Sequence, residues 1–182
     1  MLSRVEKFEV ALKQTECDAV LVTNLKNIYY LTGFSGTEAT VFISKKRRIF
    51  LTDSRYTLIA KGVVEGFDIV ETRDAVGEIA KIIADDKLEK IGFDDEISYA
   101  YFKMLESVFA GHELVPMTGF IENLRMIKDE QEIATIRRAC QISDQAFLDV
   151  LDFIKPGETT ELAVMNFLDA RMRQLGASGA SF

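Results

Sequence analysis

The sequence of 182 residues has one histidine, two cysteines, no block of like charge and no uncharged apolar run approaching the length of a membrane span, about 18 residues. A single histidine, His112, excludes metal motifs that need two histidines and leaves a serine–histidine–aspartate triad one possible base. We expect an exposed or capping imidazole there. Cys17 and Cys140 lie far apart and form no Cys-x-x-Cys pair, which favours buried, reduced thiols in a cytoplasmic protein.

The charge balance bears on the partners of the protein. The chain has 22 basic and 29 acidic residues, a formal net charge of −7, so we expect neither a nucleic acid nor an anionic membrane as the main partner. The N-terminus, MLSRVEKFEV, lacks the basic start and continuous apolar run of a signal peptide. We therefore expect a soluble, unprocessed chain whose partners are small solutes or proteins.

Helical and strand patterns alternate over the first two thirds of the chain. Ser3 and Glu6 have the spacing of a capping box. Val5, Phe8 and Leu12 then recur on one helical face, which predicts an opening helix. The later alternation favours an α/β fold with a mixed β-sheet flanked by helices. The predicted strands are DAVLVTN, ATVFIS, RRIFLT, FDIVE, KIGFD and HELVPM, and the predicted helices are SRYTLIAKG, DAVGEIAKIIADD and SYAYFKMLESVFAG.

Local details of this stretch can also be predicted. The charged turn KKR between ATVFIS and RRIFLT indicates an antiparallel hairpin. Tyr29 and Tyr30 lie in a strand-like run, which predicts one side chain facing in and one facing out. Asp53 precedes SRYTLIAKG and is predicted to cap that helix.

The composition changes near residue 125, where we place a domain boundary. Beyond it, KDEQEIATIRRACQISDQAFLDVLDFIKPG predicts one long helix ended by Pro156 and Gly157, and TTELAVMNFLDARMRQLG predicts a second helix. The final GASGASF, with apolar Phe182 at its end, is typical of a chain that is entering a further buried element. The predicted apolar stripe of the long helix comprises Ile133, Ile136, Cys140, Phe147, Leu151 and Ile154.

No short motif completes a catalytic constellation. GFSG around Ser35 lacks the glycine two residues after the serine that a nucleophile elbow requires. TGFSGTEAT lacks the Gly-Lys-Ser/Thr ending of a phosphate-binding loop, so a turn accounts for it better. The acidic groups Asp85–Asp86 and Asp94–Glu96 have no further ligands at calcium-loop spacing, and we expect solvated loop charge at both.

Three stretches together resemble the Xaa-Pro peptidase family, the pita-bread metallopeptidases that include prolidase, aminopeptidase P and the related creatinase. They are NIYYLTGFSG from Asn27 to Gly36, LTDSRY from Leu51 to Tyr56, and LRMIKDEQEIATIRRACQISDQAF, which begins at Leu124. The likeness spans essentially the whole chain in order and spacing. It implies a creatinase/prolidase-like N-terminal domain over residues 1–124, followed over residues 125–182 by a linker helix and the start of a truncated catalytic domain.

The resemblance implies a function for a complete protein. In the family, the catalytic domain supplies two aspartates, a histidine and two glutamates that hold two divalent metals, usually manganese or cobalt, and it hydrolyses bonds involving proline. Those positions would lie beyond Phe182, so the resemblance implies no catalytic residue, metal ligand or cofactor in this chain, and no activity from it alone. The family's N-terminal domain resembles a lid and dimerisation module, which implies a homodimer acting on proline-containing peptides.

The same resemblance makes one loop and one short motif the candidate contacts with substrate or a partner subunit. In a structural alternative, Phe34 packs inward, Arg55 pairs with Asp53 or another carboxylate, and Tyr56 packs on the sheet with its hydroxyl satisfied. The candidate residues are Phe34, Ser35, Glu38, Arg55 and Tyr56.

Two other interpretations are open. The chain could be a stand-alone, non-catalytic module that binds a peptide or a protein. Alternatively, the apolar faces of the two C-terminal helices, which include Val164, Phe167 and Leu168, could drive self-association, because exposed apolar patches mark interfaces or aggregation hazards.

Overall fold

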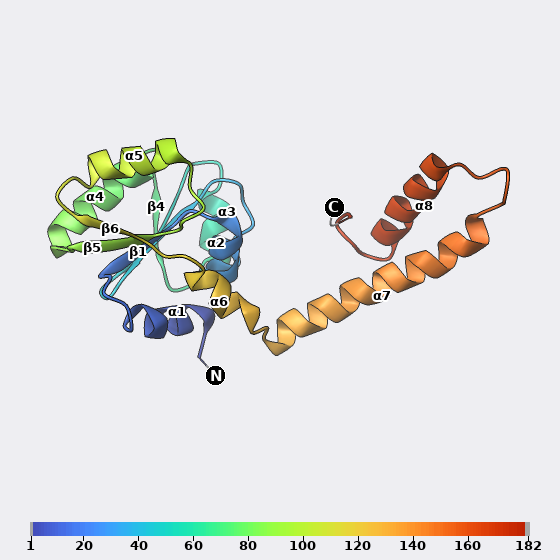
Figure 1. The fold of residues 1–182 in the computed structure, drawn as a ribbon, viewed down its shortest axis with the longest axis horizontal. Helices are drawn as coiled ribbons and strands as arrows, with labels where there is room; N and C mark the ends of the chain where they lie inside the picture. The colour runs from blue at the N-terminus through green and yellow to red at the C-terminus, as the bar shows by residue number, and fades with distance from the viewer. Residues whose placement is uncertain (1, 181–182) are drawn as a thin grey trace. The chain divides into compact units, whose positions relative to one another are not determined.

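The computed structural model describes residues 2–180, and the chain divides into two compact units, Met1–Met126 and Ile127–Phe182 (Figure 1). The expectation about Phe182 lies outside the described residues. None of the helices between residues 2 and 180 has the length and apolar character needed to cross a membrane.

In the described part of the first unit, six strands form one sheet in the order β4-β3-β2-β1-β5-β6. β2 pairs antiparallel with both β1 and β3. β5 pairs in parallel with β1 on one side and β6 on the other, and β3 pairs in parallel with β4. Five strands therefore end at one edge of the sheet, which we call the carboxyl edge, and β2 begins there. The strands are β1 (Ala19–Val22), β2 (Thr40–Ser44), β3 (Arg48–Thr52), β4 (Asp68–Glu71), β5 (Lys90–Phe93) and β6 (Glu113–Pro116).

Helices cover both faces of this sheet (Figure 1). Alternate side chains of a strand point to opposite faces, so Val20 and Val22 join one apolar core while Ala19 and Leu21 join the other. The first core is completed by α1 (Arg4–Leu12), α2 (Leu25–Thr32), α3 (Thr57–Val63) and α6 (Phe120–Met126), and the second by α4 (Ala75–Asp86) and α5 (Tyr99–Val108).

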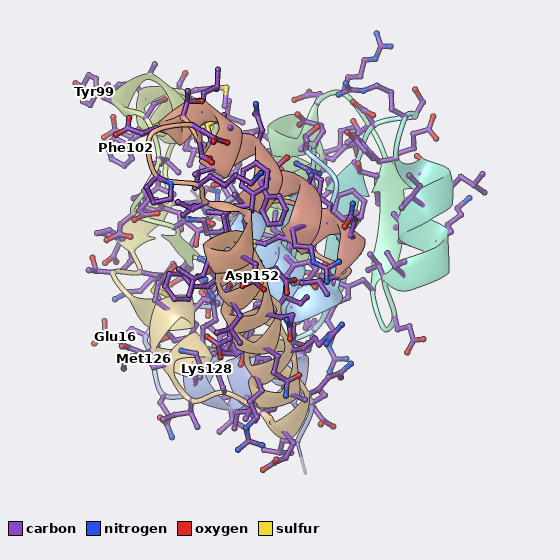
Figure 2. All side chains as sticks on the ribbon, turned by 90° about the vertical axis from the view of Figure 1, so that its right-hand side faces the viewer. Glu16, Tyr99, Phe102, Met126, Lys128 and Asp152 are labelled. Atoms are coloured by element: carbon purple, nitrogen blue, oxygen red, sulfur yellow. The ribbon has the colours of Figure 1, made fainter. Side chains whose placement is uncertain are left out.

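Helix α5 illustrates how these helices divide their side chains between core and solvent. The ring of Phe102 lies 5.5 Å from that of Phe93 on the sheet. Tyr99, at the start of the same helix, is 76% exposed and points away from the domain (Figure 2). The helix therefore buries one side only, as its apolar periodicity predicts.

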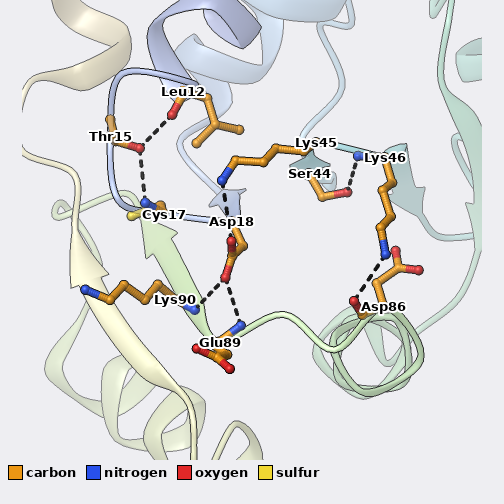
Figure 3. Close-up of polar contacts among 10 residues, drawn as sticks. All are labelled: Leu12, Thr15, Cys17, Asp18, Ser44, Lys45, Lys46, Asp86, Glu89 and Lys90. Carbon is orange, nitrogen blue, oxygen red and sulfur yellow. Dashed lines mark hydrogen bonds and ion pairs between the residues drawn. The ribbon is translucent and has the colours of Figure 1, made fainter.

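At the amino edge of the sheet, a polar network joins the strand starts to the β2–β3 turn (Figure 3). Asp18 accepts hydrogen bonds from the backbone N–H groups of Glu89 (2.9 Å) and Lys90 (3.1 Å), and pairs with Lys45 at 3.5 Å. The hydroxyl oxygen of Thr15 accepts a hydrogen bond from the backbone N–H of Cys17 at 3.2 Å. These bonds satisfy backbone donors beside the central parallel pair, β1 and β5.

The basic run Lys45–Arg48 lies in this network and is locally neutralised. Arg47 pairs with Asp86 at 2.9 Å, and Arg48 forms two hydrogen bonds with Glu9, at 2.6 and 2.9 Å. The Asp86 side chain is only 7% exposed, so the expectation of solvated charge at Asp85–Asp86 is wrong for Asp86. The reason is that the β2–β3 turn brings a guanidinium to the end of α4.

The six predicted strands, the hairpin and the opening helix are confirmed. Ser3 and Glu6 form the capping box at α1, and Val5, Phe8 and Leu12 are its buried residues. The helices predicted between strands are present as α3, α4 and α5.

The strand-like interpretation of Tyr29 and Tyr30 is wrong, because both lie in helix α2. Asn24 caps this helix by accepting the N–H of Lys26 at 2.9 Å, and Gly33 ends it with a φ of 74°. Caps at both ends thus override the β propensity of the run. The one-in, one-out pattern does hold, since Tyr30 is 4% and Tyr29 55% exposed.

Two further helix predictions need correction. α3 begins at Thr57 with Tyr56 at its N-cap and no side-chain cap, so Asp53 does not cap it. The carboxylate of Asp53 instead accepts the N–H of Arg55 at 2.9 Å. Helix α6 is not predicted from the sequence, because its seven residues are too few to show a repeated apolar period, although Phe120, Ile121 and Leu124 pack against the first core.

The described second unit is a helical hairpin of α7 (Glu130–Phe153) and α8 (Glu161–Gln174). Arg171 pairs with Asp149 at 2.5 Å, and the rings of Phe153 and Phe167 stack 4.5 Å apart. Both helices agree with the sequence prediction.

The buried side of α7 is not the predicted stripe. Ile136, Phe147 and Leu151 are at least half exposed, and Cys140 is exposed, whereas Cys17 is buried. The expectation of two buried cysteines is therefore wrong for Cys140. The physical reason is that α8 packs on a different side of α7, which buries Ile142, Ala146 and Val150.

Candidate functional site

The carboxyl edge carries a topological switch point. From β1 the chain builds outward through β2, β3 and β4, then returns to place β5 on the other side of β1. α2, which follows β1, and α5, which follows β5, therefore lie on opposite faces of the sheet. In sheets of this kind the crevice outside the strand ends at such a point is the usual ligand site.

Two adjoining depressions, of about 310 and 530 Å³, lie at this edge. They share Glu38, Thr40, Arg73 and Ala75 in their linings, and we call them together the carboxyl-edge groove. The smaller depression extends over the ends of β3 and β4, and the larger one reaches Ser98 at the start of α5.

The loop from Gly33 to Glu38 borders this groove and is anchored from inside by Phe34. Phe34 is 1% exposed, and its ring meets the rings of Phe50 and Tyr56 edge-on at 5.0 and 5.6 Å. Such contacts stabilise beyond the buried area alone. Phe34 thus packs inward, as the structural alternative predicts, and its side chain is not available at the surface.

Gly36 closes the loop onto this aromatic cluster. A Cβ atom at Gly36 would lie 2.2 Å from Cζ of Phe34 and 2.9 Å from Cδ1 of Tyr56, so only glycine fits without rearrangement. One residue later, the hydroxyls of Thr37 and Tyr56 are 2.8 Å apart, and this hydrogen bond lowers the pKa of Tyr56. These contacts join the loop to Tyr56 at the start of α3.

Arg55 projects beside this loop. The carboxylate of Asp53 accepts hydrogen bonds from Nε and Nη2 of Arg55 at 2.9 and 2.6 Å, and this pairing lowers the pKa of Asp53. The guanidinium also lies 5.4 Å from the centre of the Tyr56 ring, a cation–π distance. Arg55 therefore pairs with Asp53, and Tyr56 has a satisfied hydroxyl, as the structural alternative predicts.

The groove presents charges of both signs. Arg55 and Arg73 supply cations, and Glu38 and Asp53 supply carboxylates. Tyr101 also lines the groove, and burial raises its pKa. This lining suits a polar molecule carrying both charges better than a polyphosphate. The start of α4 is already capped, because Asp74 accepts the N–H of Gly77 at 2.9 Å.

The expectation of solvated charge is also wrong for Asp94 at this edge, because β1 and β5 bury it. It is 8% exposed and accepts the N–H groups of Thr23 and Asn24 at 2.6 and 2.8 Å. Burial raises its pKa despite these bonds. A usable signal is its position directly after the buried strand KIGF, where side chains reach the switch point.

The predicted candidate residues come together only in part. Glu38 and Arg55 line the groove, Ser35 is exposed on the loop, and Phe34 and Tyr56 lie behind it. His112 is remote from them in the fold, because it precedes β6 and its Nδ1 lies 2.9 Å from the carbonyl oxygen of Leu88. Within residues 2–180, no group of three His, Cys, Asp or Glu side chains could hold a metal ion.

The fold is a mixed α/β domain with a groove of mixed charge at its carboxyl edge. A family model described as the creatinase/prolidase N-terminal domain matches residues 4–127. The chain belongs to this family, and the resemblance and the fold class predicted from the sequence are confirmed.

Known relatives agree with this assignment. An uncharacterised peptidase, YqhT, of Bacillus subtilis is 35% identical over 98% of this chain and 51% of its own length. The structure of the Xaa-Pro dipeptidase from Bacillus anthracis is 35% identical, with a TM-score of 0.91, over 98% of this chain and 50% of that one. The chain thus spans about half the length of the curated relatives it matches, their N-terminal half.

A third relative matches about two thirds of this chain. The structure of an Xaa-Pro aminopeptidase from Streptococcus thermophilus is 57% identical, with a TM-score of 0.66, over 68% of this chain and 96% of that one.

Proposed function

We propose that this chain is the N-terminal, lid and dimerisation portion of a metal-dependent Xaa-Pro dipeptidase or aminopeptidase, and that it does not hydrolyse peptides by itself. The observation that carries the proposal is the pattern of coverage. The chain aligns along 98% of its length with only half of the Bacillus anthracis dipeptidase. The other half of that relative has no counterpart among these residues.

In this proposal residues 1–124 are the N-terminal domain, and residues 125–182 are the linker helix and the start of the catalytic domain. The compact unit that ends at Met126 and the family match that ends at residue 127 support it. The complete enzyme uses two divalent metals, manganese or cobalt. The described residues do not fit such a centre, since no three potential ligands gather in them.

The loop of residues 33–38 and the LTDSRY motif form a rim toward a proline-containing peptide or a partner subunit of a homodimer. Ser35, Glu38 and Arg55 present exposed polar groups there, and Phe34 and Tyr56 hold the rim in place from behind. The mixed charges of the groove suit the charged ends of a short peptide.

A cytoplasmic location without nucleic-acid or membrane partners completes the proposal. Two unpaired cysteines support the reducing compartment, and the net charge of −7 opposes binding to anionic polymers. The basic run Lys45–Arg48 is no exception, because its guanidinium groups pair with Glu9 and Asp86.

One observation favours a second candidate function, self-association of this chain. The hairpin of α7 and α8 leaves large apolar side chains exposed, including Phe147 at 59%, Leu162 at 63% and Met165 at 58%. Surfaces of this kind mark an interface or an aggregation hazard.

Hydrolysis of an Xaa-Pro dipeptide by the purified chain, with added manganese and with a chelator control, tests the proposal. A prolidase assayed in parallel shows that the conditions support turnover. We expect none from this chain, because a metal needs several convergent ligands to activate water. Chelator-sensitive turnover that follows the protein through further purification would overturn the proposal.

A further inference from the structure

A buried asparagine, Asn27, stands at the centre of a polar cluster at the carboxyl edge. It lies on α2 and is 1% exposed. A buried side-chain amide needs partners for two donor hydrogens and one acceptor oxygen, because a buried donor or acceptor without a partner destabilises the fold. Its Nδ2 donates to Asp94 at 3.2 Å and to Glu122 at 2.7 Å, and its Oδ1 accepts from Arg125 at 2.9 Å. Asn27 therefore satisfies all of its hydrogen-bonding groups through charged partners.

These partners come from two different elements. Asp94 follows β5 and is itself fixed by two backbone N–H groups, whereas Glu122 and Arg125 belong to α6. Asn27 thus joins the end of a central strand to a helix that is distant in the sequence.

The charges in the cluster explain why an amide is needed at this point. The carboxylates of Asp94 and Glu122 both face the amide group, and the only cation that contacts it in the described structure is Arg125, 3.9 Å from Glu122. The two N–H groups of Asn27 separate carboxylates that would otherwise repel, and its oxygen receives the guanidinium. Alanine would leave all three charged groups without this bridge.

Helix α6 has two kinds of anchor: Phe120, Ile121 and Leu124 pack against the first core, and the bridge at Asn27 holds its polar side. The Phe120 ring meets the Phe8 ring at 5.3 Å, and Ile121 is buried. Toward the other end, the polar contacts to α2 include the Arg125 bond to Asn27 and a 3.4 Å hydrogen bond from the Tyr30 hydroxyl to the Leu124 carbonyl. Met126, the next residue, ends the first unit.

We propose that Asn27 is a positioning residue that fixes the end of α6 to the carboxyl edge, and so sets the point at which the chain leaves the first unit. This inference goes beyond the proposed function and does not depend on it.

Amide hydrogen exchange of the whole 182-residue chain tests the proposal. In Asn27→Ala, we expect exchange in α6 to accelerate about tenfold or more, the effect of losing hydrogen bonds to charged groups, while β1 and β5 keep their rates within about threefold. Asn123→Ala is the matched control, because it removes an exposed amide from α6 itself and should leave both regions unchanged.

Two results would overturn the proposal. One is unchanged exchange in α6, which would show that the other contacts suffice to hold it. The other is equal acceleration in α6, β1 and β5, which would show that Asn27 supports the whole domain and has no particular effect on α6.

A second variant keeps the test decisive if Asn27→Ala does not fold. Asn27→Asp places a third carboxylate beside Asp94 and Glu122 when ionised, but protonation restores one donor and keeps an acceptor oxygen for Arg125. After correction for intrinsic exchange, α6 should exchange fast near pH 8 and approach the native rate near pH 5. A ratio to the native chain that does not change with pH would contradict the proposed bridge.

Discussion

Replacing Gly36 with alanine tests the account of the rim loop directly. The added Cβ would lie 2.2 and 2.6 Å from ring atoms of Phe34 and 2.9 Å from Tyr56. Real Cβ atoms do not approach other atoms so closely, so something has to move. Phe34 cannot move freely, because it is 1% exposed and is held between Phe50 and Tyr56.

The cost follows from the kind of displacement required. Overpacking a filled site by one methyl group destabilises proteins by about 1–3 kcal/mol, and displacing Phe34 also disturbs two edge-on ring contacts worth about 0.5–1.5 kcal/mol each. We expect Gly36→Ala to lower the free energy of unfolding by about 2–3 kcal/mol. At about 3 °C per kcal/mol for a chain of this size, the melting temperature should fall by about 6–9 °C.

Gly62→Ala is the matched control, because the same substitution meets nothing within 4 Å at a position inside α3. Alanine is the better helix former, so we expect stabilisation by about 0.5–1 kcal/mol. The chain has no tryptophan, so unfolding is followed by circular dichroism. If both variants melt within about 1 °C of the native chain, or if Gly36→Ala is the more stable one, the reasoning about the aromatic cluster is refuted.

Two further predictions concern stability and association. Burial raises the pKa of Asp94 above its unfolded value, so its contribution to stability is fully present below the unfolded pKa of about 3.9 and is lost as the pH rises through the folded pKa. The excess stability of the native chain over Asp94→Asn, measured by urea unfolding, should therefore decline from pH 4 upward, and a constant difference would contradict the role of burial. Removing residues 127–182 should raise solubility and abolish any self-association seen by sedimentation, because the exposed Phe147 and Met165 are removed with them. A full chain that is monomeric and equally soluble would show that the α7–α8 hairpin does not drive self-association.

Much of the fold could be predicted because local patterns and tertiary packing agree over most of the chain. The apolar strands and the capping box at Ser3 follow from short-range rules that the sheet then reinforces. Several of the predictions that fail involve residues whose state depends on a distant partner. Asp86 is buried because Arg47 reaches it, and α6 forms where it packs against the first core. In contrast, α2 is helical because Asn24 and Gly33 cap its β-prone run.

The candidate site was less accessible from the sequence. The LTDSRY and GFSG stretches could be singled out, but the burial of Phe34 could not be decided, because it depends on the positions of Phe50 and Tyr56 in space. Likewise, Asp94 looks like one of several loop carboxylates until β1 and β5 are placed side by side.

The sequence by itself determined the family, through its resemblance in three stretches. It also determined the α/β class and the alternation of elements, because periodicity and capping act over a few residues. Only the tertiary structure decided which charges are buried, which side of α7 is covered, and that Asn27 meets Asp94, Glu122 and Arg125. Such outcomes depend on contacts between segments far apart in the chain, and no local pattern records them.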